Sequence, residues 1–306
     1  MKKSEQLTKL STGEHFAEVN NIVIHYHVAG AGPVLLLPSP GWGPSVDYIR
    51  PLTIFEQYFT MVYFDTRHSG QSTGPEDPEQ YTLEHFVADI DALREYLDQP
   101  QIFVAGHSGG GHQVLEYGIR HSDHLSGIIS IDAIAAADAL RGAELMKRIA
   151  FKKDEPYYVN NPSVYEKASA LMSIMGSDKA PKTLREIIDT MGCFYFHEPE
   201  KAKEIFSNLE FNDQVFGYVN AMGFQGKNLL PELHQIKAPV LIISGDDDFI
   251  CDPMTQAVRI RAHIPSSKLV ILDDCGHFPW IEQPRAFNEQ CELWFNELGL
   301  QQQTKQ

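Results

Sequence analysis

Five consecutive residues, Gly106-His107-Ser108-Gly109-Gly110, decide the fold of this chain. They fit the pattern G-x-S-x-G, in which a serine stands on a sharp turn between a strand and a helix. The apolar run at residues 101–105 predicts the strand, and Val114, Leu115 and Ile119 share one face of the helix predicted to follow. The glycines allow the close approach of strand and helix that such a turn needs. The sequence therefore predicts an exposed serine hydroxyl at a helix N-terminus, where negative charge is favoured.

The segments around this turn alternate between strand and helix patterns. Residues 22–28 alternate apolar and polar side chains, and we expect them to form an antiparallel edge strand. Further strands are predicted at residues 33–37, 61–64, 127–131, 240–244 and 269–272, and helices at residues 83–97, 254–263 and 285–298. Strands that alternate with helices imply parallel pairing and right-handed crossovers. The sequence thus predicts an α/β fold with a mostly parallel sheet flanked by helices.

This alternation stops for about one hundred residues in the second half of the chain. Between residues 135 and 234 the sequence shows helical pieces rich in aromatic residues and methionine, and no clear strand pattern. The aromatic residues and methionines line an apolar pocket, or they pack the helices against the sheet; both readings stay open. We expect residues 1–134 and 235–306 to form the α/β core domain and residues 135–234 an inserted helical cap.

The composition restricts the class of protein and its partners. The 306 residues carry a formal net charge of −16, which argues against a nucleic acid or an anionic membrane as a partner. No apolar run has the length of a membrane span, and the polar N-terminus shows no signal peptide. We therefore expect a cytoplasmic protein. Its cysteines show no zinc spacing and are expected to be free thiols: Cys193, Cys251, Cys275 and Cys291.

Two further groups follow strands in the order that a serine nucleophile needs. A serine hydroxyl becomes reactive when a base takes its proton and an acid orients that base. His277 comes shortly after the last predicted strand and is the expected base for Ser108. Asp248 follows the strand before it and is the preferred acid, because the loop needs several residues to turn back toward the histidine. Asp132, at the end of the strand that precedes the cap, is the main alternative.

A tetrahedral intermediate on the serine needs two N–H donors. The backbone N–H of Gly109, directly after the serine, is the first expected donor. The second is expected from the loop at residues 38–43, whose glycines allow close approach, with Trp42 N–H as the donor. The alternative reading of this loop is a proline-rich turn with Trp42 in the core.

These motifs resemble the α/β-hydrolase superfamily and, within it, the proline iminopeptidase-like branch. The resemblance covers nearly the whole chain outside residues 135–234, and its carriers are residues 106–110, 65–72, 87–94, 245–248 and 276–277. Two departures from the family pattern stand out. The family's oxyanion loop usually begins with His-Gly, where this chain has Pro40-Gly41, and His68 stands where the family usually carries glycine.

The resemblance implies a serine hydrolase that forms an acyl-enzyme, without a cofactor or a metal, on a small-molecule or short-peptide substrate. The iminopeptidase branch implies an aminopeptidase whose cap glutamates hold the substrate amine, with Glu198, Glu200 and Glu204 as candidates. A carboxylesterase without peptidase activity remains open. So does a non-hydrolytic member, either a ligand receptor or a cofactor-independent oxygenase or lyase. The pair His25-x-His27 has metal-like spacing but no evident third ligand, so we read it as polar residues of a strand.

Overall fold

The computed structural model describes residues 8–207 and 209–303. Within them, eight strands form one sheet in the order β1-β2-β4-β3-β5-β6-β7-β8. β2 pairs antiparallel with β1 and β4, and the other neighbours pair parallel. The strands are β1 (Gly13–Val19), β2 (Ile22–Gly30), β3 (Val34–Pro38), β4 (Thr60–Phe64), β5 (Ile102–His107), β6 (Leu125–Ile131), β7 (Val240–Gly245) and β8 (Lys268–Leu272). The predicted α/β fold with a mostly parallel sheet is confirmed.

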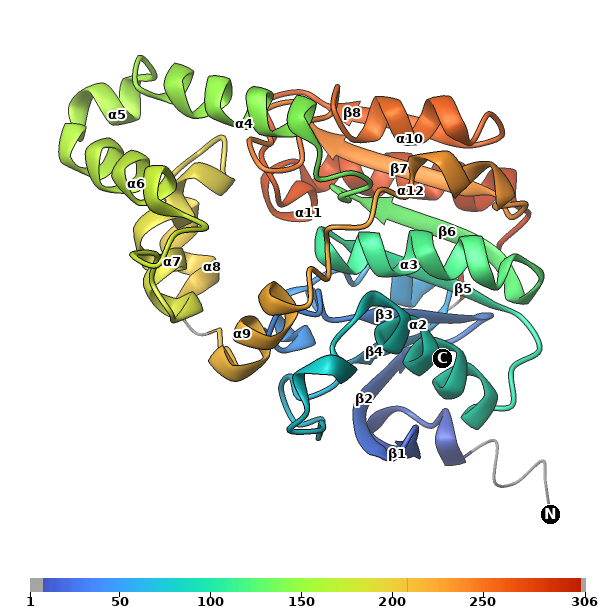
Figure 1. The fold of residues 1–306 in the computed structure, drawn as a ribbon. Coiled ribbons are helices and arrows are strands. Elements are labelled where there is room, and N and C mark those ends of the chain that lie inside the picture. Colours follow the sequence, from blue (N-terminus) through green and yellow to red (C-terminus); the bar gives the residue numbers. More distant parts are fainter. Residues whose placement is uncertain (1–7, 208, 304–306) are drawn as a thin grey trace.

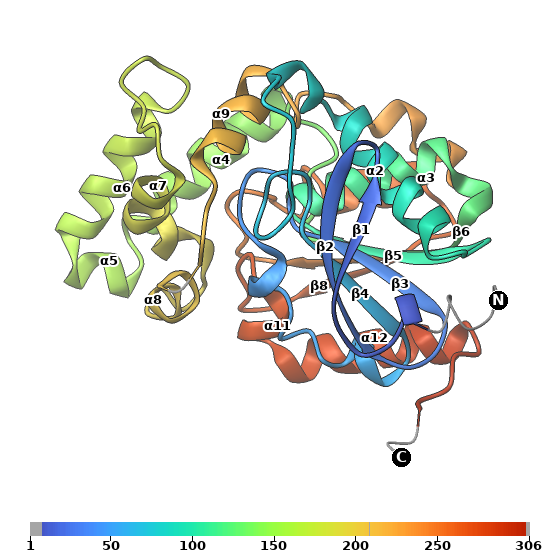
Figure 2. The ribbon, with the colours of Figure 1, turned by 90° about the horizontal axis from the view of Figure 1, so that it is seen from below.

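Helices cover both faces of the sheet, as its apolar strands require. β3, β5 and β7 are buried along their whole length. One face packs against α2 (Leu83–Tyr96), α3 (Gly109–Arg120) and α10 (Ala257–His263), and the opposite face packs against α12 (Pro284–Glu297). Figure 2 shows α2 and α3 on one side of the sheet and α12 on the other. These helices match the predicted ones to within a few residues.

The prediction for residues 22–28 was half right. They form most of β2, and their apolar side chains face the core as expected. The strand is not the edge, however, because β1 pairs along its outer side. β1 was missed because its only fully buried side chain is Ala17, while Phe16 is exposed and polar residues fill most of the other positions. An edge strand with one solvated face carries a weak apolar signal.

Between β6 and β7 the described residues contain helices and no strand of the sheet. They are α4 (Ala139–Lys152), α5 (Pro156–Asn160), α6 (Pro162–Ile174), α7 (Leu184–Met191), α8 (Lys201–Phe206) and α9 (Asp213–Ala221). In both views, α5 to α8 stand to one side of the sheet (Figures 1 and 2), and Figure 1 shows them beyond the ends toward which β6 and β7 run. We propose that these helices form the cap, and the domain boundaries stay a prediction. None of the described helices has both the length and the apolar character needed to cross a membrane.

Candidate active site

Ser108 occupies the tight turn between β5 and α3. Its backbone has φ 55° and ψ −117°, a conformation that residues with a Cβ rarely adopt and that is found mostly where function demands it. Its N–H donates to the carbonyl of Ile131 on β6 at 3.0 Å, which fixes the turn to the sheet. A Cβ at Gly106 would lie 2.3 Å from the carbonyl oxygen of Gly110, so only glycine fits there. The strand–turn–helix arrangement predicted from the motif is therefore present.

His277 and Asp248 meet at the same end of the sheet. His277 Nδ1 lies 2.7 Å from Asp248 Oδ2, and both side chains are buried. The other carboxylate oxygen, Oδ1, accepts from the backbone N–H groups of Ile250 at 2.9 Å and Cys251 at 3.0 Å. Burial raises the pKa of Asp248, but His277 and these N–H groups outweigh burial and leave it below its ordinary value. Asp248 is thus an ionised carboxylate that holds the imidazole of His277.

Asp132, the alternative acid, has different partners. Its Oδ1 accepts from the hydroxyl of Ser244 at 3.0 Å and from the N–H of Gly245 at 2.9 Å. Burial, followed by the negative charge of Asp248, raises the pKa of Asp132 well above its ordinary value. Its buried surroundings therefore favour the protonated form of Asp132 over a second negative charge beside Asp248. The structure brings Asp248, and not Asp132, into hydrogen-bond contact with His277.

The predicted oxyanion loop packs against the start of α3. A Cβ added to Gly109 would lie 2.5 Å from the carbonyl oxygen of Pro40 and 3.1 Å from Cδ1 of Trp42. Gly41 and Gly43 have φ 88° and 114°, which favour glycine. The structure therefore places Trp42 beside Gly109. The use of its N–H as an oxyanion donor stays a prediction.

A cavity of about 380 Å³ opens next to these residues. Ser108 and His277 line it together with side chains from α4, α7 and α9 and the segments between the helices. Its lining is mainly aromatic and aliphatic: Trp42, Pro44, Tyr48, Ile134, Leu184, Ile187, Ile188, Tyr195, Phe206, Leu209, Phe211, Phe216, Val219, Phe224, Ile250 and Phe278 are among the residues. Some aromatic residues of the segment 135–234, such as Phe211 and Phe216, thus line the cavity. Others, such as Phe194 and Phe196, are fully buried in the core. The aromatic residues of this segment therefore serve both expected purposes, because some line the cavity and others pack the core.

Charged side chains are scarce in this cavity. Arg141 is its one lysine or arginine, and no aspartate or glutamate among the described side chains lines it. Glu198 and Glu200 are exposed on the segment that leads into α8, and neither is among the lining residues. The side chain of Glu204 lies outside the part of the chain that the structure describes.

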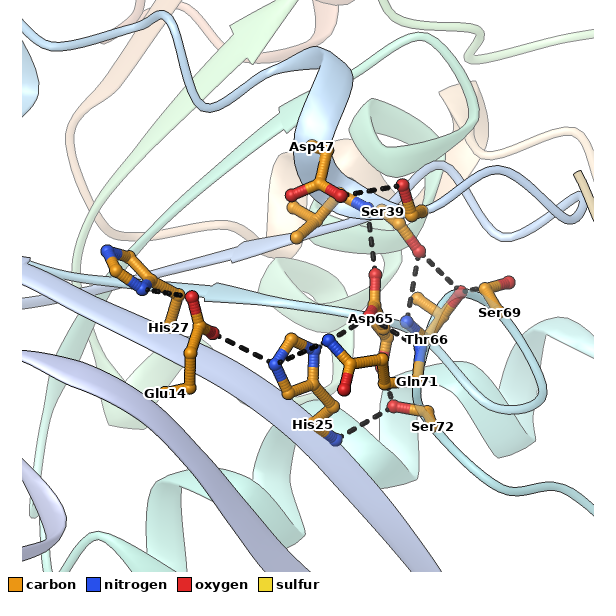
Figure 3. Close-up of polar contacts among 12 residues, drawn as sticks. Glu14, His25, His27, Ser39, Asp47, Asp65, Thr66, Ser69, Gln71 and Ser72 are labelled. Atoms are coloured by element: carbon orange, nitrogen blue, oxygen red, sulfur yellow. Dashed lines mark hydrogen bonds and ion pairs between the residues drawn. The ribbon is translucent and has the colours of Figure 1, made fainter. Parts of the chain in front are cut away.

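The pair His25-x-His27 belongs to a different polar cluster, shown in Figure 3. His25 Nδ1 lies 2.8 Å from Asp65 Oδ2, its Nε2 lies 2.9 Å from Glu14 Oε2, and His27 Nδ1 lies 2.8 Å from Glu14 Oε1. Asp65 Oδ1 also accepts from the N–H of Val46, at the start of the 3-10 helix Val46–Tyr48, at 2.8 Å. Glu14 and Asp65 are therefore hydrogen-bond partners of both ring nitrogens of His25 and of Nδ1 of His27, which supports the structural reading.

Three groups of side chains have the spacing of metal ligands among the described residues. Two overlap the site: His107 with Asp132 and His277, and Asp248 with Cys251 and His277. Both contain His277, whose Nδ1 is already engaged by Asp248. In the first group, the raised pKa of Asp132 also disfavours the deprotonated carboxylate that a metal ligand needs.

The third group joins Asp91 to His121 and His124, away from the cavity. Asp91 Oδ1 already accepts from Arg94 Nε at 2.7 Å and from the hydroxyl of Tyr117 at 2.8 Å, so this carboxylate is already paired with a cation. All four cysteines of the chain are unpaired, as predicted.

Most of the chain matches the sequence profile of one known protein family. The profile described as "alpha/beta hydrolase fold" matches residues 33–284, which is more than half of the chain. The chain belongs to this family. The resemblance inferred from residues 106–110 and the motifs around them is thereby confirmed.

Several curated relatives of this hydrolase family are proline iminopeptidases. The enzyme of Saccharolobus solfataricus is 24% identical over 279 residues, which cover 86% of this chain and 85% of that protein. A proline iminopeptidase of Lactobacillus crispatus is 27% identical over 282 residues, 87% of this chain and 90% of that protein.

Solved structures share the fold. A proline iminopeptidase-related protein from Thermus thermophilus superposes with a TM-score of 0.71 at 21% identity, covering 93% of this chain and 97% of that one. An enol-lactonase from Burkholderia xenovorans superposes with a TM-score of 0.64 at 21% identity, covering 92% and 100%.

The structure brings several residues to the site that were not predicted from the sequence. His107, Tyr48, Arg141 and Tyr195 all line the cavity with Ser108. His107 could have been predicted from the sequence, because it occupies the variable position before the serine in the G-x-S-x-G pattern. The other three come from distant segments and carry no local signal.

Proposed function

We propose that the chain is a serine hydrolase that cleaves small carboxylic esters through an acyl-enzyme. The observation that carries this proposal is the hydrogen bond between His277 Nδ1 and Asp248 Oδ2 at 2.7 Å, in a cavity that both His277 and Ser108 line. A nucleophile on a strained turn, a base and an ionised acid that orients the base are the parts that acyl transfer needs.

The reaction follows from these roles. Ser108 Oγ attacks the ester carbonyl while His277 Nε2 takes its proton, and Asp248 stabilises the imidazolium that forms. The N–H groups of Gly109 and Trp42 hold the oxyanion of the tetrahedral intermediate. His277 then returns the proton to the leaving alkoxide. Water, deprotonated by His277, hydrolyses the acyl-enzyme, which releases the acid and restores Ser108.

An aminopeptidase is the second candidate, because several relatives are proline iminopeptidases. The lining of the cavity favours the ester. A free N-terminal ammonium in an apolar cavity needs a carboxylate partner, and no described side chain that lines the cavity supplies one. Among the described residues that line the cavity, Arg141 is the one lysine or arginine, and its positive charge repels an ammonium.

The test compares initial rates of the wild type and Ser108→Ala on short-chain p-nitrophenyl esters and on prolyl and alanyl p-nitroanilides. We expect ester turnover that disappears in the variant, and labelling of Ser108 by a serine-reactive phosphonate. Anilide turnover that depends on Ser108 establishes the aminopeptidase instead. If neither substrate is turned over above the variant's background and the phosphonate does not label the protein, the hydrolase proposal fails in favour of a non-hydrolytic member of the family.

A further inference from the structure

Arg141 stands in the cavity without a negative partner. It belongs to the first turn of α4, and its Nε donates to the backbone carbonyl of Ile250 at 3.1 Å. Its two terminal nitrogens have no hydrogen bond or ion pair within the described residues. This bond to Ile250 fixes the guanidinium close to the loop that carries Asp248, since Ile250 N–H donates to that carboxylate.

The neighbouring carboxylates are already paired with other cations. Arg148 Nη2 lies 2.5 Å from Asp252 Oδ2, and Arg259 Nη2 lies 2.7 Å from Asp138 Oδ2. Neither aspartate is therefore available to Arg141. Arg141 is half-buried, and its guanidinium is left without a carboxylate partner beside a mainly apolar lining.

Tyr195 supplies a second unused donor to the same cavity. It lines the cavity with Arg141, and its hydroxyl has no hydrogen-bond partner among the described residues. Its backbone carbonyl accepts from His277 N–H at 2.7 Å, which ties the residue to the catalytic loop. Burial raises the pKa of Tyr195, and the nearby Arg141 opposes that rise only in part, so the phenol stays protonated and can donate.

The terminal nitrogens of Arg141 and the Tyr195 hydroxyl are hydrogen-bond donors without an acceptor among the described residues. An anion would supply that acceptor. Arg141 is half-buried, and a guanidinium beside an apolar lining pairs best with the two oxygens of a carboxylate. The mainly apolar remainder of the lining fits a hydrocarbon spacer rather than a polar chain. A substrate that fits all three features has an ester group at Ser108, a free carboxylate at Arg141 and an apolar spacer between them. Such a molecule is the half-ester of a dicarboxylic acid.

We propose that Arg141 and Tyr195 bind the free carboxylate of the substrate, and that the enzyme hydrolyses half-esters of apolar dicarboxylic acids. The substrate class rests on the proposed hydrolase function, whereas the anion site does not. The hydrolysis balances as a simple ester cleavage, in which water cleaves the acyl–oxygen bond of the half-ester and yields a dicarboxylate, an alcohol and a proton.

The first measurement tests the anion site without turnover. Octanoate and octanamide, which share a chain and differ in charge, are titrated calorimetrically into Ser108→Ala. We expect octanoate to bind about 10- to 100-fold more tightly, as a charge-assisted hydrogen bond in an apolar site predicts. Adding Arg141→Gln should abolish the difference, and Arg141→Lys should keep part of it. Lys147→Gln is the matched control, because Lys147 lies on the same helix, is 57% exposed and pairs with Glu144.

The second measurement tests the substrate class by comparing kcat/KM for mono-p-nitrophenyl suberate and methyl p-nitrophenyl suberate. We expect the half-ester to be preferred about 10-fold or more, with a preference that Arg141→Gln removes and Lys147→Gln retains. Equal binding of octanoate and octanamide overturns the anion site. Preferential binding without a preference for the half-ester overturns the substrate class alone. If neither ester is hydrolysed above the Ser108→Ala background, the hydrolase proposal fails, and the calorimetric result still decides the anion site.

Discussion

His107 Nε2 donates a hydrogen bond to the backbone carbonyl oxygen of His277, 2.7 Å away, and so ties the turn of Ser108 to the loop of the proposed base. Because a carbonyl only accepts, Nε2 carries the proton, and Nδ1 accepts from the hydroxyl of Tyr48 at 3.0 Å. Burial and then the nearby His277 lower the pKa of His107 well below its ordinary value, which keeps the ring neutral. The ring of His107 is thus neutral and held in one tautomer, which accepts from Tyr48 and donates to His277.

Replacing this ring should therefore misplace the base. We expect His107→Phe, which keeps a planar ring but loses both hydrogen bonds, to lower kcat on p-nitrophenyl esters by about 10- to 100-fold, since small misplacements of a catalytic group are costly. Tyr48→Phe removes only the donor to Nδ1 and should have a smaller effect. Steady-state kinetics and a melting curve for each variant separate misplacement from unfolding. A His107→Phe enzyme with wild-type kcat contradicts the positioning role.

The contacts of the two buried aspartates predict opposite outcomes for their amide variants. Asp248→Asn should lower kcat by roughly 10⁴-fold, because an amide can no longer stabilise the imidazolium of His277. Asp132→Asn should stay within about 10-fold of the wild type, since a neutral amide oxygen can still accept from Ser244 and Gly245. The measurement is kcat at neutral pH for both variants. A large loss in Asp132→Asn and a small loss in Asp248→Asn reassigns the acid.

Arg67 and Asp89 form a buried ion pair outside the site. Arg67 Nε and Nη2 each lie 2.8 Å from a carboxylate oxygen of Asp89, and the two side chains are 3% and 2% exposed. Removing one partner leaves the other charge buried, so Asp89→Leu should lower the free energy of unfolding by about 3–5 kcal/mol.

The double variant Arg67→Met/Asp89→Leu should recover much of that loss, because neither charge then remains buried. Urea denaturation of the wild type, both single variants and the double variant measures the coupling. If the double variant is as unstable as the sum of the single ones, the pair is not coupled.

The parts of the site that could be predicted carry local signals. The turn at residues 106–110 is defined by its glycines and by the strand and helix beside it, and Asp248 and His277 each follow an apolar strand. Those signals fix which end of the sheet each residue reaches, because parallel strands end at the same edge.

The missed parts depend on contacts between distant segments. Arg141 reaches Ile250 across 109 positions, and His107 reaches His277 across 170. β1 was not predicted for another reason. The sequence signal for a strand is apolar residues at alternate positions that become buried, and Ala17 is the one buried residue of β1. Its presence also explains Glu14, which lies opposite His27 in the strand register and completes the cluster around His25.

That cluster predicts how stability changes with pH. The hydrogen bond to Asp65 raises the pKa of His25 above 6.5, against the effect of burial, and Glu14 adds to the rise. A raised pKa means that the folded protein binds the proton more tightly than the unfolded chain does. The stabilisation is therefore complete below the unfolded pKa of about 6.5 and is lost as the pH rises through the higher folded value.

The variant that tests this is His25→Gln, which cannot take up a proton at this position. We expect the wild type to exceed it in free energy of unfolding by more at pH 6 than at pH 9, because only the protonated ring can donate to both Asp65 and Glu14. Urea denaturation at both pH values gives the difference, and His234→Gln, a change at an exposed histidine, serves as the control. A gap between wild type and His25→Gln that is unchanged or wider at pH 9 would show that the ring acts in its neutral form.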